Sequence, residues 1–217
     1  MIEVVSDVVC PWCFIGKRRL TKALALLGRA DEPVRWKPFQ LNPGAPREGF
    51  ERAPYRTRKF GSAEFAQQLE DRVVEAAREE GLELRFDRVT SIPNSFDAHR
   101  LIRLAQGAGL QDQAVEALFQ AYFMEGQDVG DPSVLLAVAA SIGMSAPEVV
   151  EMLAGQAGAA EVRAEEEEAR RRGVSGVPTF FVNGEPLTSG AHPAPLLASF
   201  LGTALGQDES RGAGGAS

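Results

Sequence analysis

Cys10 and Cys13 are the two residues of this chain whose type and spacing could carry out chemistry. They are its only cysteines, so a scaffold of several disulfides is excluded. Two thiols separated by two residues can close a small disulfide ring or supply half of a metal site. In a redox pair we expect Cys10 to be the exposed nucleophile and Cys13 to be the resolving thiol that releases a mixed disulfide.

A zinc site is the alternative use of the two thiols. It would need two further ligands, and the only histidines are His99 and His192. Their positions are far from the compact spacing of zinc-binding motifs. We therefore expect a redox pair and no metal.

The segments around the cysteines predict a strand, a helix and a second strand. Residues 2–5 are apolar and β-branched, and residues 34–41 alternate apolar with polar side chains. Between them, apolar residues at helical spacing predict a helix from near Cys10 to near Gly28. Pro38 indicates either that the second strand is an edge strand or that it ends there. This order predicts parallel strands joined by a crossover helix.

The first turn of that helix would hold Cys10, where backbone N–H groups and the helix dipole favour a thiolate. Pro11 fits there because its missing N–H has no intrahelical partner to lose. Trp12 is expected to shield the disulfide ring and to offer an apolar face to a substrate. The cations at 17–19 are expected to be solvated, because the helix directs them away from its N-terminus.

Val177 and Pro178 form the second chemical element. Two glycines precede them and a predicted strand, residues 179–182, follows. Taken alone, this segment favours a trans proline that starts a strand. X-Pro bonds are where cis peptides occur, and the Cys-x-x-Cys motif after the first strand favours the cis form here. A cis bond here would leave the Val177 backbone beside the thiols, free to pair with an extended substrate chain.

The chain as a whole divides into two halves of one sheet and a helical insertion. We expect the sheet from residues 1–60 and 173–205, with the helical domain at 61–172. Residues 42–61 are rich in Pro and Gly and suggest a connecting loop. Residues 206–217 are polar and Gly-rich, which predicts a disordered tail.

The charged run at 165–172 is expected to be an exposed, solvated helix ending at Gly173. Its Glu and Arg residues are spaced i,i+4 in the favourable order. This pattern needs no functional explanation.

Asp7 and His99 are candidate supporting residues. Asp7 is three residues before Cys10, so it either accepts the Cys13 proton through a water or closes the turn after the first strand. His99 is expected to be a hydrogen-bonded structural histidine, with a role in lining the active-site groove as the alternative.

Composition and charge argue against several other classes of function. There are 23 Lys and Arg against 30 Asp and Glu, a net charge of −7, which argues against a general nucleic-acid binder. No apolar run is long enough to span a membrane. The N-terminus lacks the features of a secretory signal, so we expect a cytoplasmic protein.

The two motifs, in this order, resemble the thioredoxin superfamily, and the long helical insertion resembles its DsbA-like branch. Four segments are similar to the FrnE subgroup of that branch: Ser-Asp-Val-Val-Cys-Pro-Trp-Cys at 6–13, Asn-Ser-Phe-Asp-Ala-His-Arg at 94–100, Ala-Tyr-Phe-Met-Glu-Gly at 121–126 and Val-Ser-Gly-Val-Pro-Thr-Phe at 174–180. The resemblance implies an α/β, thioredoxin-like fold with a large all-helical insertion. It also implies a thiol–disulfide oxidoreductase acting on protein or small-molecule disulfides.

The resemblance carries the nucleophile onto Cys10, the resolving thiol onto Cys13 and the cis-proline onto Pro178. It implies disulfide-containing protein or peptide substrates, recycling by glutathione or a thioredoxin-type reductant, and no prosthetic cofactor. Periplasmic members have a His between their cysteines where this chain has Pro11 and Trp12. A reductase or isomerase role is therefore as well supported as an oxidase role.

Two other functions remain open. The branch also includes glutathione-dependent 2-hydroxychromene-2-carboxylate isomerases and kappa-class glutathione transferases, which usually have Ser in place of Cys10. The intact cysteine pair favours redox chemistry over isomerisation. The third reading is a holdase-like chaperone that binds clients through an apolar groove.

Overall fold

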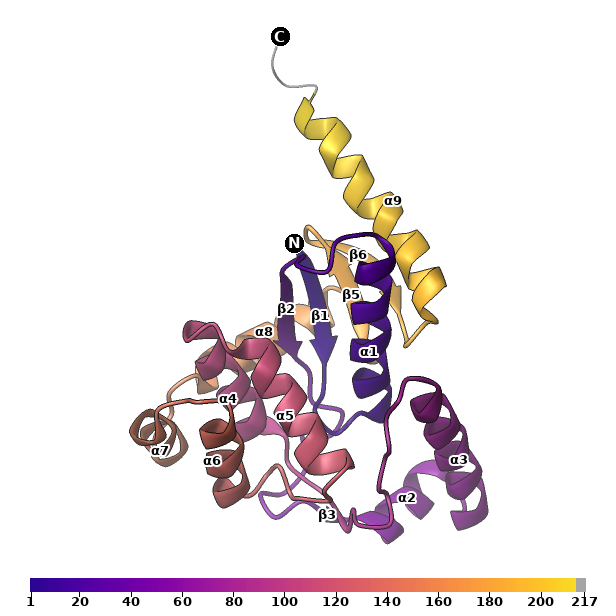
Figure 1. The fold of residues 1–217 in the computed structure, drawn as a ribbon. Coiled ribbons are helices and arrows are strands. Elements are labelled where there is room, and N and C mark those ends of the chain that lie inside the picture. Colours follow the sequence, from indigo (N-terminus) through magenta and orange to yellow (C-terminus); the bar gives the residue numbers. More distant parts are fainter. Residues whose placement is uncertain (214–217) are drawn as a thin grey trace.

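A computed structural model of the chain describes the backbone of residues 1–213 and the side chains of residues 1–206. Its centre is a four-stranded sheet in the order β2-β1-β5-β6, built from both ends of the chain (Figure 1). The strands are β1 (Ile2–Ser6), β2 (Val34–Pro38), β5 (Thr179–Val182) and β6 (Glu185–Ser189). β1 pairs parallel with β2 and antiparallel with β5, so Val4 lies between Trp36 and Phe180.

Helix α1 (Pro11–Leu26) joins the two parallel strands, as predicted. β2 lies at the edge of the sheet, where a strand can contain Pro38 without losing a ladder hydrogen bond. β5 and β6 form a hairpin whose turn residues, Asn183 and Gly184, have φ angles of 51° and 87°. Positive φ angles at both positions explain the Asn-Gly pair.

A helical block connects β2 to β5 and lies next to the sheet in Figure 1. Its helices are α2 (Arg52–Phe60), α3 (Ala63–Glu79), α4 (Phe96–Gly107), α5 (Gln111–Phe123), α6 (Pro132–Ser141), α7 (Ala146–Ala154) and α8 (Ala159–Arg171). A short antiparallel pair, β3 (Phe50–Glu51) with β4 (Ser91–Ile92), also belongs to it. The predicted α/β fold with a helical insertion is confirmed, whereas the proposed domain limits stay a prediction.

The connecting loop predicted at 42–61 is wrong in its second half, which contains β3 and α2. Pro54 lies in the first turn of α2, where a backbone N–H has no intrahelical partner. Tyr55 is buried, stacks on Phe50 and donates a hydrogen bond from its hydroxyl to Asn42 Oδ1 at 2.5 Å. These tertiary contacts stabilise a helix that the Pro and Gly content concealed.

The predicted disordered tail is also corrected. Helix α9 (Ala194–Ala213) includes residues 206–213, and residues 214–217 lie outside the described residues. A helix that is already nucleated by packing gains one hydrogen bond for each residue added, so polar residues can continue it. Leu197, Leu201 and Leu205 are buried, and the helix packs on α1.

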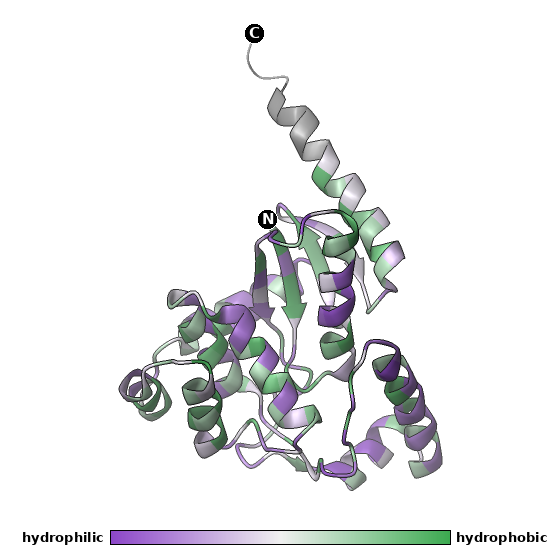
Figure 2. Cartoon of the chain, in the orientation of Figure 1, coloured by the Kyte–Doolittle hydropathy of each residue, from purple (hydrophilic) through white to green (hydrophobic). Residues whose placement is uncertain are grey.

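The core joins the sheet to the insertion beside the cysteines. Phe14 of α1 stacks on Phe119 and Phe123 of α5, with ring centroids 5.0 and 6.2 Å apart. All three side chains are fully buried. Figure 2 shows how hydropathy is distributed: hydrophobic residues lie on the central strands, and hydrophilic residues cover much of α3. In the described part of the chain, no helix combines the length and the apolar character needed to cross a membrane.

Candidate active site

Cys10 is the N-cap of α1, directly after the turn that follows β1. Its backbone N–H donates to the carbonyl of Asp7 at 3.0 Å, and its own carbonyl accepts from the N–H of Cys13 at 3.0 Å. Pro11 occupies the first helical position, as predicted. The turn therefore presents the Cys10 side chain at the positive end of the helix dipole.

Both cysteines are free thiols and both are buried. Cys10 is 4% exposed and Cys13 is 0% exposed, so the expectation of an exposed nucleophile is wrong. Trp12, at 38%, is the exposed residue of the motif. Cys10 is covered because the segment before β5 packs over it.

That segment is Val177-Pro178, and its peptide bond is cis. The Cys10 thiol lies 3.6 Å from the Val177 carbonyl oxygen, as a donor to it. The close fit depends on Gly16, which sequence reasoning missed. A Cβ at position 16 would lie 3.0 Å from Pro178 Cγ and 3.7 Å from the Phe180 ring. An isolated glycine inside a helix was the available signal, because it often marks a close packing contact.

The Cys13 thiol is held in its protonated form. Burial raises the pKa of Cys13 well above the ordinary value of 9.0, and a hydrogen bond and the charge of Cys10 raise it further. Hydrogen bonds from the Ser6 side chain and the Asp7 backbone oppose this in part. The contact of Ser6 with Cys13 was not predicted from the sequence.

Asp7 and His99 meet beneath the thiols, although 92 positions of sequence separate them. Asp7 is fully buried, and its Oδ2 accepts the Leu41 N–H at 2.7 Å. Its Oδ1 lies 3.4 Å from His99 Nε2 and 3.4 Å from the N–H of Val9. Asp7 therefore closes the turn, as one reading predicted, and also faces a buried histidine.

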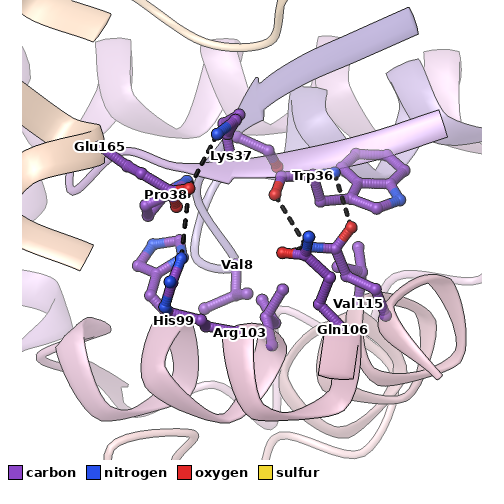
Figure 3. Close-up of a pocket in the computed structure, with 12 residues that line it drawn as sticks. Val8, Trp36, Lys37, Pro38, His99, Arg103, Gln106, Val115 and Glu165 are labelled. Carbon is purple, nitrogen blue, oxygen red and sulfur yellow. Dashed lines mark hydrogen bonds and ion pairs between the residues drawn. The ribbon is translucent and has the colours of Figure 1, made fainter. Parts of the chain in front are cut away.

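His99 borders a small cavity between β2 and α4 (Figure 3). Its Nε2 is buried and makes no hydrogen bond of good geometry to the described residues. The cavity has a volume of about 10 Å³, which is room for about one water. Ser6 also lines it. Both roles considered for His99, structural histidine and groove lining, therefore stay predictions.

The zinc alternative requires ligands that the fold keeps apart. His192 Nε2 pairs with Thr188 Oγ1 at 2.9 Å, and its ring contacts Phe200. The described residues contain no group of three or more His, Cys, Asp or Glu side chains that could hold a metal ion.

The three cations of α1 are not solvated, contrary to expectation. Lys17 and Arg19 are buried and bind Asp112 at 2.8 Å and Glu80 at 2.7 Å. Arg18 also binds a carboxylate, on α5. The prediction failed because α1 is covered by α3 and α5, whose acidic side chains face it.

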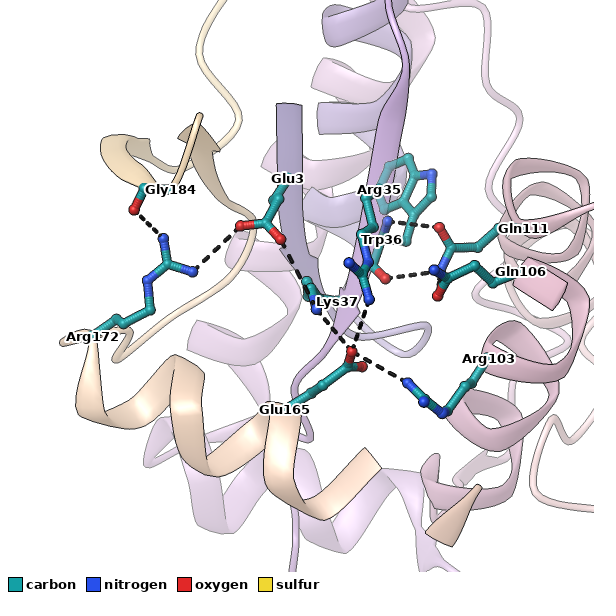
Figure 4. A network of polar contacts seen from close by, with 10 residues as sticks. All are labelled: Glu3, Arg35, Trp36, Lys37, Arg103, Gln106, Gln111, Glu165, Arg172 and Gly184. Carbon is teal, nitrogen blue, oxygen red and sulfur yellow. Dashed lines mark hydrogen bonds and ion pairs between the residues drawn. The ribbon is translucent and has the colours of Figure 1, made fainter. Parts of the chain in front are cut away.

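Two residues of the charged run, Glu165 and Arg172, form ion pairs with neighbouring elements (Figure 4). Glu165 Oε1 accepts from Lys37 at 2.8 Å and from Arg35 and Arg103 at 3.3 Å each. Arg172 pairs with Glu3 at 3.4 Å. α8 is therefore tied to the edge strand β2 and to α4, and the solvated reading is wrong for these residues.

Comparison with known proteins agrees with this geometry. A family model described as DSBA-like thioredoxin domain matches residues 1–202. The chain is similar to the crystal structure of a probable DsbA oxidoreductase from Streptomyces coelicolor, with 37% identity, a TM-score of 0.88, and coverage of 94% of this chain and 89% of that one. It also shares the fold of a 2-hydroxychromene-2-carboxylate isomerase, with 18% identity, a TM-score of 0.73, and coverage of 96% and 98%.

A curated relative is the uncharacterized protein YwbO of Bacillus subtilis. It is 28% identical over 143 residues, which are 66% of this chain and 66% of that protein. The alignment thus spans slightly less than two thirds of the relative's length.

Proposed function

The chain belongs to the DSBA-like thioredoxin domain family, and on that premise we propose that it is a dithiol–disulfide oxidoreductase. The observation that carries this proposal is the Cys10 thiol at the N-terminus of α1, 3.6 Å from the Val177 carbonyl. Cys13 is next to it on the same helix, in hydrogen-bond contact. A paired thiol at a helix N-terminus, beside a free backbone edge, suits attack on a disulfide.

The cycle has two steps. The Cys10 thiolate attacks one sulfur of the substrate disulfide, a mixed disulfide forms, and the other substrate sulfur leaves as a thiolate that takes up a proton. Cys13 then loses its proton and attacks the Cys10 sulfur, which releases the second substrate thiol and closes the Cys10–Cys13 disulfide. Two electrons pass from the enzyme to the substrate, and the reverse sequence oxidises a substrate dithiol.

The second step needs a proton acceptor, because burial raises the pKa of Cys13. Asp7 carries a fully buried carboxyl group, and its backbone contacts Cys13. We assign it as general base through a water, with His99 at 3.4 Å as its partner. Both are supporting residues in this proposal, and Cys10 and Cys13 carry the chemistry.

The substrate chain would lie along Val177-Pro178. An extended peptide can pair with the Val177 backbone as an added strand. Trp12 is 38% exposed next to the thiols and offers an apolar contact, with Pro11 beside it. Disulfide-containing proteins or peptides are therefore the proposed substrates.

Glutathione or a thioredoxin-type protein is the proposed recycling partner, and the dithiol cycle uses no prosthetic group. Assignment to the FrnE subgroup and a cytoplasmic location remain predictions. A glutathione-dependent isomerase is the rival enzyme class. It is disfavoured because both Cys10 and Cys13 are present and in contact.

The first experiment is a titration of the purified protein across glutathione and dithiothreitol redox buffers, with the thiols followed by an alkylation gel shift. We expect a reversible two-electron couple. A potential near about −270 mV would indicate a reductase, and one of about −120 to −180 mV an oxidase or isomerase. Absence of any reversible couple would overturn the proposed function.

Two further assays identify the rival functions. Glutathione-dependent isomerisation that survives Cys13→Ser would support the isomerase class. Suppression of aggregation that is unchanged when both cysteines are replaced would support a holdase.

A further inference from the structure

A polar pocket of about 600 Å³ is lined in part by the segment that follows β2, and the same segment contacts Asp7 of the thiol site through Leu41. Its walls come from residues 40–47, the start of α4, the connection between α7 and α8, and α8 itself. The volume is that of a ligand site. Most small-molecule pockets are apolar, whereas this one is lined mainly by arginine, carboxylate and amide side chains, so it suits a polar occupant.

Polar side chains that line the pocket make hydrogen bonds to one another and to the backbone. Asn94 accepts from the Gln40 side chain at 3.3 Å and donates to the carbonyl of Ala45 at 2.7 Å. Arg100 is 4% exposed; it binds Asp97 at 2.7 Å and donates to three backbone carbonyls around the end of α7. These bonds hold the walls in place without a ligand.

Two guanidinium groups at the pocket are left without an anionic partner. The carboxylate of Asp97 is paired with Arg100, and Glu166 accepts the N–H of Gln40 at 2.6 Å. Arg47 and Arg163 both line the pocket and are exposed. Within the part of the chain that the structure describes, neither lies within 4.0 Å of a carboxylate. Arg163 instead stacks over Phe96, 4.8 Å from the ring centroid.

The pocket and the thiols share one short segment. Gln40 lines the pocket, and the next residue, Leu41, donates its N–H to Asp7 beneath the cysteines. Leu41 also packs in the same small apolar cluster as Val177. An extended peptide advances by about 3.3 Å per residue, so the residues that flank a disulfide held at Val177 can run along this segment toward the pocket.

We infer that this pocket binds carboxylate groups on the peptide that flanks the substrate disulfide, so that the preferred substrates are acidic disulfide peptides. The inference rests on the proposed function. Guanidinium groups match carboxylates in a bidentate geometry. They also offset the repulsion that a chain of net charge −7 exerts on an acidic substrate.

The test uses two peptides that contain one intramolecular disulfide and differ only in flanking residues, Glu in one and Gln in the other. Wild type should reduce the Glu peptide with a kcat/KM about five- to tenfold higher, and added salt should shrink this preference. The double variant Arg47→Gln/Arg163→Gln should lose the preference and keep its rate on the Gln peptide.

A matched control carries the same loss of two positive charges elsewhere. Arg72 and Arg78 are exposed on α3, outside the pocket. Arg72→Gln/Arg78→Gln should therefore keep the preference for the Glu peptide. If the control loses the preference as completely as the pocket variant, net charge and not the pocket selects the substrate, and the inference fails.

A binding measurement separates failure of the pocket from failure of the redox function. The Glu peptide with both cysteines replaced by Ser is titrated into each protein and followed by fluorescence anisotropy. Tighter binding to wild type than to the pocket variant supports the inference even if no peptide is reduced. Equal binding of the Glu and Gln peptides by wild type overturns it, whatever the redox result.

Discussion

The Cys10 thiol lies 3.6 Å from the carbonyl oxygen of Val177, a residue 167 positions further along the chain. This contact joins the two sequence motifs into one site and covers the nucleophile, which is only 4% exposed. A substrate that pairs with the Val177 backbone must therefore approach over Cys10. Binding of such a substrate chain and its access to the Cys10 thiol would therefore occur at the same place.

Cys13→Ser is expected to trap mixed disulfides between Cys10 and the substrate, because no resolving thiol remains. Non-reducing gels and mass spectrometry of the adducts measure this. Cys10→Ser is the matched control and should give neither turnover nor adducts. Adducts formed by Cys10→Ser and not by Cys13→Ser would reverse the two roles.

The raised pKa of Cys13 predicts that the reduced protein loses stability in alkali. The unfolded thiol ionises near its ordinary pKa of 9.0, whereas the folded thiol still holds its proton there. The unfolded state then binds fewer protons, so the free energy of unfolding falls as pH rises through this range. Urea unfolding of the reduced protein at pH 8 to 10 should show a steeper fall for wild type than for Cys13→Ala, and parallel slopes would contradict the prediction.

Asp7→Asn is expected to slow the resolving step and leave formation of the mixed disulfide nearly unchanged. The amide oxygen can still accept from Leu41, but the side chain can no longer take a proton. Single-turnover mixing with a chromogenic disulfide separates the two steps. An equal slowing of both steps would indicate a structural role alone.

Gly16→Val should destabilise the protein and lower turnover, because a side chain at this position meets Pro178 at 3.0 Å. Overpacking of this kind costs about 1–3 kcal/mol. It should also move Val177 relative to Cys10. Gly107, at the end of α4, has open space around it and provides the control. Gly107→Val should unfold at nearly the wild-type urea concentration and keep its turnover.

Glu165→Gln should cost about 1–3 kcal/mol of stability, because it removes the carboxylate that Arg35, Lys37 and Arg103 share. Lys37 then keeps its longer ion pair with Glu3, at 3.9 Å. Glu167, two residues along the same helix, is exposed and, among the described residues, forms an ion pair only with Arg171. Glu167→Gln should change the free energy of unfolding by less than about 0.5 kcal/mol. Equal changes of the free energy of unfolding for the two substitutions would show that the ion pairs of Glu165 do not stabilise the fold.

Local patterns in the sequence were enough to predict the elements that position the thiols. Strand and helix periodicity placed Cys10 at the start of α1, and Pro38 placed β2 at the edge of the sheet. The strand and helix signals depend on the conformational preferences of adjacent residues, and such preferences can be read from the chain directly. The cis bond at Val177-Pro178, which the structure contains, was predicted only from the Val-Pro segment together with the Cys-x-x-Cys motif, because the segment alone favoured a trans proline.

Only the tertiary structure decided what the polar side chains contact. Asp7 meets His99, Lys17 meets Asp112, and Glu165 gathers cations from two other elements. A charged residue at an exposed helical spacing looks the same in sequence whether water or a neighbouring helix covers it. Which of the two occurs depends on the packing of segments tens of residues apart. The same packing buries Cys10 and forms the polar pocket that Arg47 and Arg163 line. The sequence thus determined the reactive pair and its scaffold, whereas long-range packing determined the electrostatic surroundings of that pair.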